Sequence, residues 1–377
     1  MHILHVSARY SPFVGGIETH IREVGTRMVE RGHAVTVLTT DPKGVLPPVE
    51  GDRGMNIIRV KAWPTDRDYY FAPAVYSEIE RGRYDIIHVQ GYSTFVAPIA
   101  MLSALRHNLP YVLTFHSGGH SSGLRNAIRG IQRWVLAPIA AQANHLIGVS
   151  EFEADFFSRT MRIDRSKFSV IPNGAELPKP SDPLPAREPH LVLSIGRLEK
   201  YKGHHRAIEA FPRVLSRFPD ARLRIIGSGP YEPELRALIN SLGLHRIVTI
   251  ESIPSAERQR LTDLLYSAGL VVLLSEYEAH PVSVMEAVSV GRPVLVADTS
   301  GLHELAVKGL CNAIPLTTPS VGVAAAIVAH LVTDTDSHSP VGVNVINWDD
   351  CTAQLLMVYE AVLKQKTLRL PSGVIAQ

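Results

Sequence analysis

The sequence has few of the features that mark several large classes of protein. Its 377 residues include only two cysteines, Cys311 and Cys351, which fit neither a disulfide framework nor a zinc-ligand spacing. No uncharged apolar run reaches the roughly 18 to 20 residues that a membrane-spanning helix needs. The N-terminus lacks the basic start and long apolar core of a signal peptide and is typical of a first strand. We therefore expect a soluble protein of the reducing cytoplasm, at most peripheral on the inner face of the plasma membrane.

Net charge is also nearly absent. The chain has 38 Lys and Arg against 36 Asp and Glu, a balance too even for a dedicated nucleic-acid binder. With 45% hydrophobic and 20% charged residues, it has the composition of a globular protein and not of a disordered one. The charge is nevertheless unevenly placed. No Asp or Glu occurs between Asp85 and Glu151, so the near-neutral total conceals a basic segment.

What the first half does contain is an alternation of short strands and helical patterns. The strand candidates are short, rich in Val and Ile, and bounded by Gly, Pro or polar residues. They are Ile3–Val6, Ala34–Thr39, Asn56–Val60, Asp85–Val89, Tyr111–Phe115, His145–Val149 and Ser169–Ile171. Helical stretches such as Ile17–Arg31 lie between them, which predicts a parallel sheet with helices on both faces.

A proline-rich stretch interrupts this alternation, which then restarts. Six prolines between Pro172 and Pro189 predict a stiff linker at residues 177–189. The strands expected beyond it are His190–Ile195, Arg222–Ile226, Val248–Ile250, Leu270–Leu274 and Pro293–Val296. The sequence thus predicts two doubly wound, Rossmann-like α/β domains, at residues 1–176 and 190–347, that face each other across a cleft. A helix within residues 348–377, from Trp348 to Lys364, is expected to cross back to the first domain.

Ligands of doubly wound sheets bind beyond the carboxyl ends of the strands, so the loops at those ends are the candidate sites. The first such loop carries Gly15 and Gly16 at the start of a helix, which would suit a phosphate or would simply make a tight turn. A dinucleotide fingerprint fails both here and at Gly227-Ser-Gly229, where Glu232 takes the third position. A dehydrogenase is therefore disfavoured.

The loop that opens the second domain concentrates positive charge. Arg197, Lys200 and Lys202 lie between a buried strand and a helix, where a guanidinium and an ammonium would meet a diphosphate. The alternative is an ordinary solvated loop, because most lysines in loops face water.

Two carboxylates flank the start of a later helix. Glu278 lies in the loop after an apolar strand, and Glu286 lies eight residues further on, in the second helical turn. They could accept hydrogen bonds from the hydroxyls of a ribose and a hexose, while the helix N-terminus meets a phosphate. Alternatively, Glu278 is a helix-start carboxylate and Glu286 a surface acid. Ala287 and Val288 follow Glu286 on a mostly apolar helix, which argues against a surface acid.

In this order, these motifs resemble the retaining, nucleotide-sugar-dependent glycosyltransferases of GT-B fold, carbohydrate-active family four (group 1). The resemblance extends over almost the whole chain. The matching segments are Gly15-Gly16 with Glu18, Arg31-Gly32-His33 with Val35 and Val37, Asp85 to His88, Thr114 to His116, Val149-Ser150, Ile171 to Gly174, Gly196 to Leu198 with Lys202-Gly203, Gly227 to Pro230, Glu278 with Glu286, and Gly291 to Val294.

The resemblance implies a role for each matched residue. Arg197 and Lys202 would hold the donor diphosphate and stabilise its developing charge, while Glu278 and His116 would contact the transferred sugar. These four residues form the implied catalytic set. The further nucleotide-sugar contacts would be Gly15 and Gly16 at the phosphate, Ile253 at the base, Glu286 at the ribose, the backbone at His280, Pro281 and Val282, and Asn173 at the hinge.

The implied reaction is transfer of a hexose with retention by a front-face mechanism. The loops of the expected donor site, around Gly15, Arg197 and Glu278, contain no D-x-D motif, so we expect no metal or other cofactor. The expected donor is UDP-glucose and the expected acceptor a glycan or lipid-linked saccharide, in cell-surface polysaccharide synthesis. The alternatives are a nucleotide-sugar epimerase or hydrolase of the same architecture, and a non-catalytic nucleotide-sugar binding module.

Two segments depart from the pattern of the family. Ala279 and His280 stand where many relatives have glycine or an aromatic residue, and His280 would either donate to the sugar or cap the helix. The family's G-G-x-x-E segment is reduced to residues 299–304, to which we assign no contact.

The basic segment contains a helical pattern that could bind the surface of an anionic membrane. Arg125, Arg129 and Arg133 are spaced four residues apart on a helical pattern that also contains Trp134. Such a stripe can lie on anionic lipid headgroups. The alternative is an ordinary solvated face over a core stripe formed by Ile128, Ile131, Trp134 and Val135.

Overall fold

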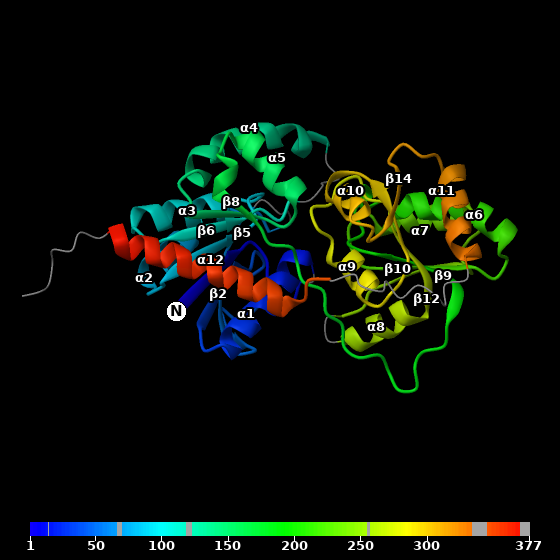
Figure 1. The fold of residues 1–377 in the computed structure, drawn as a ribbon, viewed down its shortest axis with the longest axis horizontal. Coiled ribbons are helices and arrows are strands. Elements are labelled where there is room, and N and C mark those ends of the chain that lie inside the picture. Colours follow the sequence, from blue (N-terminus) through cyan, green and yellow to red (C-terminus); the bar gives the residue numbers. More distant parts are fainter. Residues whose placement is uncertain (14, 66–69, 118–122, 255–256, 334–344, 370–377) are drawn as a thin grey trace, which may run out of the picture. The chain divides into compact units, whose positions relative to one another are not determined.

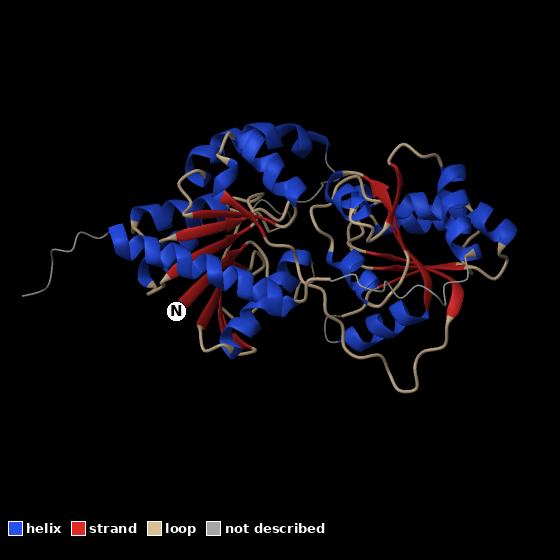
Figure 2. Cartoon of the chain, viewed as in Figure 1, coloured by secondary structure: helices blue, strands red, loops and turns tan. Residues whose placement is uncertain are grey.

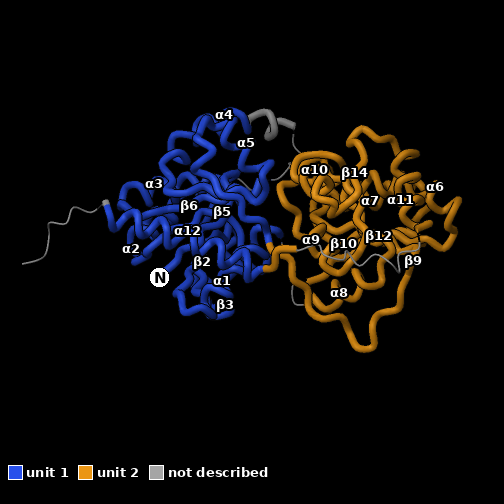
Figure 3. The backbone as a smooth tube through the Cα atoms, viewed as in Figure 1, with its two compact units in different colours: residues 1–117, 128–173, 348–377 blue, residues 118–127, 174–347 orange. Residues whose placement is uncertain are grey.

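A computed structural model describes residues 1–13, 15–65, 70–117, 123–254, 257–333 and 345–369, for 123–128 and 369 the backbone alone. The chain forms two compact units (Figure 3). Unit 1 comprises residues 1–117, 128–173 and 348–377, and unit 2 comprises 118–127 and 174–347. Within the described residues, no helix is both long and apolar enough to span a bilayer.

Unit 1 is built on an eight-stranded sheet of order β3-β4-β2-β1-β5-β6-β7-β8. Its strands are β1 (His2–Ser7), β2 (Ala34–Thr40), β3 (Val49–Asp52), β4 (Met55–Val60), β5 (Ile86–Gln90), β6 (Tyr111–Thr114), β7 (His145–Gly148) and β8 (Phe168–Val170). All neighbouring pairs are parallel except β3 and β4. The carboxyl ends of the seven parallel strands therefore lie along one edge of the sheet.

Helices cover both faces of this sheet (Figures 1 and 2). They are α1 (Gly16–Glu30), α2 (Ala74–Arg81), α3 (Val96–Arg106), α4 (Gly123–Ala140), α5 (Glu151–Met161) and α12 (Trp348–Arg369). Leu4, Val6 and Val89 share one core with apolar residues of α2 to α5. Side chains alternate between faces along a strand, so His5 and His88 face the other way, where Tyr359 of α12 bonds to His88.

Unit 2 contains a six-stranded, fully parallel sheet of order β11-β10-β9-β12-β13-β14. Its strands are β9 (Glu188–Ile195), β10 (Arg222–Ile226), β11 (Val248–Glu251), β12 (Ala268–Leu273), β13 (Val294–Asp298) and β14 (Asn312–Pro315). β12 is buried throughout and β9 is buried from Leu191 to Ile195, as a parallel sheet covered on both faces requires.

Two hydrophobic cores, one on each face, hold the unit 2 sheet between helices. The helices are α6 (His204–Arg217), α7 (Glu232–Ser241), α8 (Arg258–Ser267), α9 (Val282–Ser289), α10 (Ser300–Val307) and α11 (Ser320–Val332). One core joins the sheet to α6, α7 and α11. The other joins it to α8, α9 and α10. The apolar helical faces that the sequence showed are thus used to cover the sheet.

The structure confirms the predicted fold class and adds two strands. β3 and β14 lie at sheet edges and have four residues each. β3 contains Glu, Gly and Asp, and β14 contains Asn and Pro. Such composition gives little strand signal, because an edge strand needs little apolar surface. Helix α12 packs on unit 1, as expected. Asp349 of α12 forms ion pairs with Arg27 of α1 and with Arg31, the residue that follows α1.

The proline-rich segment packs against unit 2. Residues 171–187 form no helix or strand, and β9 begins at Glu188, two residues before the predicted start. Ser181 donates from its backbone N and its hydroxyl to Asp263 of α8, at 2.9 and 2.6 Å. Gln259 of α8 donates to the carbonyl of Lys179 at 2.7 Å. The segment is therefore held against α8 by specific hydrogen bonds and does not act only as a spacer.

Candidate functional site

The basic loop of unit 2 follows β9 and ends in a short 3₁₀ turn, Lys200–Lys202, before α6. Arg197 is about half exposed, and its guanidinium bonds to Glu199 at 3.0 Å. His204, at the start of α6, holds this loop through both ring nitrogens. They contact Ser194 Oγ at 2.8 Å and the carbonyl of Arg197 at 3.2 Å. Burial lowers the pKa of His204 to about 4, so the ring is neutral near pH 7. The motif did not single out His204.

Gly203 is the residue that lets this loop enter α6. Its φ is +75°, in the left-handed region that favours glycine. A Cβ at this position would lie 2.1 Å from the carbonyl oxygen of Leu274. Any other residue would therefore separate the Lys202 turn from the end of β12, where the loop carrying Glu278 begins.

Lys202 and Glu278 form the central ion pair of unit 2. Their Nζ and Oε1 atoms are 2.6 Å apart, and the side chains are 15% and 8% exposed. Ser275 donates a second bond to the same Oε1 at 2.8 Å. Burial alone lowers the pKa of Lys202, but the charge and hydrogen bond of Glu278 outweigh it, so the pKa lies above the ordinary lysine value. Lys202 is therefore a cation held in place beside a carboxylate.

The segment to which the sequence assigned no contact holds the Glu278 loop. Ser300 Oγ accepts a hydrogen bond from the backbone N of Glu278 at 2.9 Å, and the backbone N of Gly301 donates to the Glu278 carbonyl at 2.9 Å. Thr299 Oγ1 donates to the carbonyl of Glu276 at 2.9 Å. A Cβ on Gly301 would lie 1.8 Å from the Ala279 carbonyl oxygen. Residues 299–301 are thus positioning residues that sequence reasoning missed, because their partners lie more than twenty residues away.

Glu286 lies in the second turn of α9, as expected, and is buried. Its Oε1 accepts a hydrogen bond from Arg258 of α8 at 2.6 Å. Arg258 also donates to the carbonyl of Glu176 at 3.2 Å. The surface-acid alternative is therefore wrong, because a carboxylate with a side chain 4% exposed is inside the unit. Nothing in the sequence pattern indicated Arg258 as its partner.

The remaining predicted contacts of unit 2 lie around α9 and β11. Burial lowers the pKa of His280 to about 4, so this ring is neutral near pH 7. The N-cap of α9 is Pro281 and not His280, so the capping alternative is wrong. Val282 is the first residue of α9, and Ile253 is half-buried just after β11. The first-turn N–H groups of a helix have no partners within the helix.

In unit 1 the two glycines stand at the start of α1. Gly15 is the N-cap and Gly16 the first helical residue. A Cβ on Gly15 would lie 2.4 Å from an oxygen of the Glu18 carboxylate, so Glu18 folds back over the helix start. A carboxylate there interacts favourably with the positive end of the helix dipole. The dipole would also favour a phosphate at Gly16, which would have to share this helix start with the Glu18 carboxylate.

His116 follows β6 and belongs to a group of histidines inside unit 1. Its φ is +44°, and its Nε2 lies 2.7 Å from Gln90 Oε1. Its ring meets that of His20 edge to face at 4.7 Å. His20 in turn contacts Asn173 through Nδ1 and Oδ1 at 3.0 Å. Predicted residues His116 and Asn173 are therefore joined through His20, a link that the motifs did not reveal.

Burial keeps these imidazoles neutral. It lowers the pKa of His20 to about 4 and, with the His20 charge, lowers the pKa of His5 to about 3. Burial and the His20 charge likewise hold the pKa of His116 well below its usual range. A neutral imidazole can accept or donate one hydrogen bond at each nitrogen but carries no charge toward a diphosphate.

Glu153 of α5 holds the backbone around His116. Its carboxylate is fully buried and accepts bonds from the backbone N and the hydroxyl of Ser117, both at 2.5 Å, and from the backbone N of Val149 at 2.8 Å. Burial raises the pKa of Glu153, while these donors, with the His116 backbone, oppose the rise. Ser150, the N-cap of α5, accepts a hydrogen bond from the backbone N of Glu153 at 3.2 Å, which holds the carboxylate near both loops.

The basic stripe of α4 is not the exposed face of that helix. Arg129 and Arg133 are half-buried, with the Arg133 guanidinium 5.1 Å from the centre of the Phe156 ring. Ile131, Trp134 and Val135 are 65%, 76% and 56% exposed. The expected core stripe is therefore wrong for these three residues. The side chains of Arg125 and Ile128 lie outside the described residues.

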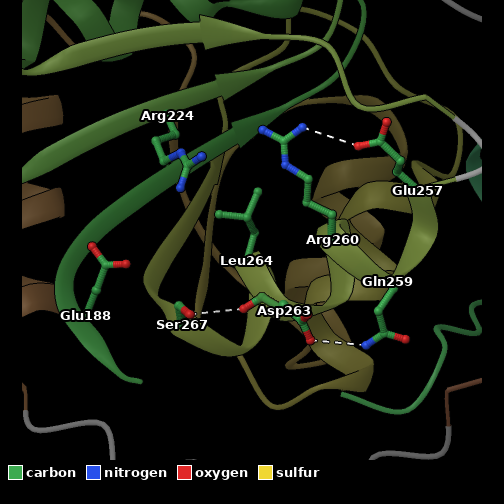
Figure 4. A pocket seen from close by; sticks show the side chains of 8 residues that line it. All are labelled: Glu188, Arg224, Glu257, Gln259, Arg260, Asp263, Leu264 and Ser267. Carbon is green, nitrogen blue, oxygen red and sulfur yellow. Dashed lines mark hydrogen bonds and ion pairs between the residues drawn. The ribbon is translucent and has the colours of Figure 1, made fainter. Parts of the chain in front are cut away.

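A hollow on unit 2 lies apart from the predicted residues (Figure 4). It is lined by Glu188, Arg224, Glu257, Gln259, Arg260, Asp263, Leu264 and Ser267. Its two arginines already pair with acids: Arg224 bonds to Glu251 at 2.6 Å, and Arg260 bonds to Glu257 at 3.3 Å. None of the lining residues is a predicted contact, and the predicted residues of unit 2 lie elsewhere, around Lys202 and Glu278.

Comparisons with known proteins show which families and structures the chain is similar to. Residues 14–178 match the family described as Glycosyltransferase Family 4, and residues 179–347 match Glycosyl transferases group 1. The chain is 27% identical to glycogen synthase of Mycobacterium tuberculosis, over 87% of this chain and 85% of that protein. It is 28% identical to the GDP-mannose:cellobiosyl-diphosphopolyprenol alpha-mannosyltransferase of Xanthomonas campestris, over 82% and 81%. The crystal structure of Anabaena HepE in complex with UDP-glucose superposes with a TM-score of 0.70 at 18% identity, covering 98% of this chain and all of that one.

Proposed function

The chain belongs to the group 1 glycosyltransferases of GT-B fold, and on that premise we propose that it transfers a hexose from a nucleotide diphosphate sugar with retention of the anomeric configuration. UDP-glucose is the proposed donor, and a glycan or lipid-linked saccharide of cell-surface polysaccharide synthesis is the proposed acceptor. The observation that carries the proposal is the buried Lys202–Glu278 pair beside the Arg197 loop.

Arg197 and Lys202 are suited to different parts of the same task. Arg197 is about half exposed and carries a planar guanidinium, which can bind two phosphate oxygens at once. Lys202 is mostly buried, and its ammonium already lies in a site with little water. Charge builds on the leaving diphosphate as the bond to the sugar breaks. Fixed cations in a site with little water stabilise such charge strongly because they need no reorganisation.

Glu278 fits the role of a sugar-binding carboxylate better than that of a nucleophile. One of its oxygens is bonded to both Lys202 and Ser275, which orients the other. In the proposed front-face reaction, the acceptor oxygen bonds to the anomeric carbon while the bond to the diphosphate oxygen breaks on the same side. The acceptor hydroxyl passes its proton to a phosphate oxygen. Glu278 would accept hydrogen bonds from sugar hydroxyls throughout.

We propose that no metal ion takes part, because Arg197 and Lys202 supply the positive charge that a divalent cation would otherwise bring to the diphosphate. The test is activity after treatment with a chelator. Unchanged turnover is expected. Loss of turnover that Mg²⁺ or Mn²⁺ restores would contradict metal independence while leaving the transferase assignment intact.

A membrane surface is the proposed location of the acceptor. The similar Xanthomonas protein is named for a diphosphopolyprenol-linked acceptor. In this chain, α4 exposes Ile131, Trp134 and Val135 beside Arg129 and Arg133. Apolar side chains with an indole and neighbouring cations are typical of helices that lie in the interface of anionic membranes. The enzyme would then act as a peripheral protein.

Donor binding decides the proposal most directly. A ligand that binds only the folded state raises the melting temperature with the logarithm of its concentration. Thermal shifts with UDP-, GDP- and ADP-hexoses should show the largest effect for UDP-glucose, and Lys202→Met should remove it. A larger shift with a GDP-sugar would correct the donor. No shift with any of them would overturn the function.

Assays on the same protein distinguish the proposed function from the alternative functions of this fold. Incubation with donor but no acceptor should release little free hexose, whereas a hydrolase would release it stoichiometrically. An epimerase would convert the donor sugar, which nuclear magnetic resonance of the nucleotide sugar detects. A binding module would show the thermal shift but no product with any acceptor.

A further inference from the structure

Exposed aromatic rings gather at the carboxyl edge of the unit 1 sheet. The described part of the chain exposes five Phe or Trp side chains, and four of them lie in loops that follow β1, β4 and β5. These four, Phe13, Trp63, Phe71 and Phe95, are 46%, 46%, 51% and 55% exposed. Single exposed apolar residues are ordinary, but a group of them marks a binding surface. We call this group the aromatic rim.

Three of the four rings are neighbours. Trp63 and Phe71 exchange both backbone hydrogen bonds, at 3.0 and 2.8 Å, as one antiparallel bridge. Residues opposed in such a bridge direct their side chains to the same face. Phe71 then meets Phe95 edge to face, with ring centres 6.4 Å apart. Segments that are distant in sequence thus place three half-exposed rings together.

Cationic side chains connect the rim to the glycine loop. The guanidinium of Arg9 lies 5.6 Å from the centre of the Phe13 ring and 5.2 Å from that of Tyr70. Arg9 Nε also donates to the hydroxyl of Tyr70 at 2.6 Å. Phe13 precedes Gly15 by two residues, and Tyr70 precedes Phe71. The rim therefore continues from the loop expected to meet the donor phosphate to the three neighbouring rings.

We propose that the aromatic rim binds the acceptor as a neutral hexose-based saccharide, an inference that rests on the proposed function. Hexopyranose rings have one face of C–H groups, which packs on the face of an aromatic ring. Their hydroxyl oxygens accept hydrogen bonds from cations. The rim supplies both, because Arg9 and Lys61 accompany its rings, with Lys61 Nζ 5.6 Å from the Trp63 ring centre. Small-molecule sites commonly combine aromatic walls with a few polar groups in this way.

The chain contains its own fluorescent control. Its three tryptophans are Trp63 in the rim, Trp134 on the outer face of α4 and Trp348, which is buried. Acrylamide quenches exposed indoles, and a bound saccharide shields the one that it covers. The probes are malto-, cello- and manno-oligosaccharides, titrated into the full-length protein and into two variants, Trp63→Phe and Trp134→Phe.

At least one oligosaccharide series should protect the fluorescence of the parent and of Trp134→Phe, but not that of Trp63→Phe. Phe71→Ala and Phe95→Ala should each weaken this protection by about tenfold, the value of one lost aromatic contact. The UDP-glucose thermal shift, measured on the same samples, should be unchanged in all rim variants, which shows that they fold.

Three results would overturn the inference: no protection by any series, protection of Trp134 alone, or protection of Trp63 by anionic vesicles but by no saccharide. The last result would make the rim a membrane contact. If donor shifts are present in each case, only the inference fails. If donor shifts are absent and saccharide still protects Trp63, the proposed function fails and the rim is a saccharide site of another kind.

Discussion

Glu278→Gln keeps the shape of the side chain but leaves the ammonium of Lys202 without the carboxylate that lies 2.6 Å away. At an effective dielectric constant of about 20, unit charges at that separation attract by roughly 6 kcal/mol. Desolvation offsets part of this attraction, and removing one partner of a buried pair costs about 3–5 kcal/mol. We therefore expect the free energy of unfolding of unit 2 to fall by about 3–5 kcal/mol.

Thermal unfolding followed by calorimetry measures this loss. For a domain of this size, the melting temperature of the unit 2 transition should fall by roughly 10 °C. Lys202→Met should also destabilise, because it leaves Glu278 buried without its partner. The double variant should recover about 2–3 kcal/mol relative to the sum of the single variants, since the two residues are in direct contact.

An exposed pair in the same unit provides the matched control. Arg236 and Glu232 are 2.7 Å apart on α7, nearly the same separation, but their side chains are 55% and 33% exposed. Glu232→Gln should cost less than about 1 kcal/mol, because water screens exposed pairs. If Glu278→Gln costs no more than Glu232→Gln, burial does not strengthen the central pair and the reasoning is refuted.

The pH dependence of the same variant gives a second check. The pKa of Lys202 is raised in the folded state, so the stability that it contributes is complete below the ordinary lysine pKa. That contribution is lost only as the pH rises through the raised value. The cost of Glu278→Gln should therefore be the same from about pH 7 to about pH 9.

Three further perturbations test other parts of the structure. The pKa of His20 is about 4 in the folded state and ordinarily 6.5, so the unfolded chain binds the proton first as the pH falls, and the free energy of unfolding should decrease by on the order of 3 kcal/mol from pH 6.5 to pH 4. His20→Gln should make the melting temperature less sensitive to pH in that range, and an unchanged dependence on pH would contradict this. Glu153→Gln should cost about 2–3 kcal/mol in urea unfolding, because its amide group would oppose backbone donors; it should also raise the donor KM more than Glu151→Gln does. Trp134→Glu should reduce co-sedimentation with anionic liposomes, whereas equal pelleting of variant and parent would argue against α4 as the membrane contact.

Sequence reasoning succeeded where a local pattern is sufficient. Strands buried on both faces are continuous apolar runs, and the predicted bounds of β10, Arg222–Ile226, agree with the structure at both ends. The burial of Glu286 also followed from its apolar neighbours. β3 and β14 were missed because edge strands have only one partner and need little apolar surface.

The α4 helix shows the limit of such reasoning. Periodicity placed Ile131, Trp134 and Val135 on one side and the arginines on another, but it could not say which side meets the protein. Hydrophobicity suggested the apolar side. The structure instead packs Leu136 inward, with Arg133 beside Phe156, and leaves Trp134 outside.

By itself, the sequence determined the two parallel sheets, the order of the loops at their carboxyl ends and the residue types in those loops. The reason is that secondary structure and burial follow from patterns only a few residues long. The tertiary structure alone decided the partners: Glu278 for Lys202, Arg258 for Glu286, Ser300 for the Glu278 backbone and Glu153 for the loop at His116. Each of these contacts joins segments more than twenty residues apart. Such contacts depend on how strands are ordered and helices packed, which no local pattern encodes.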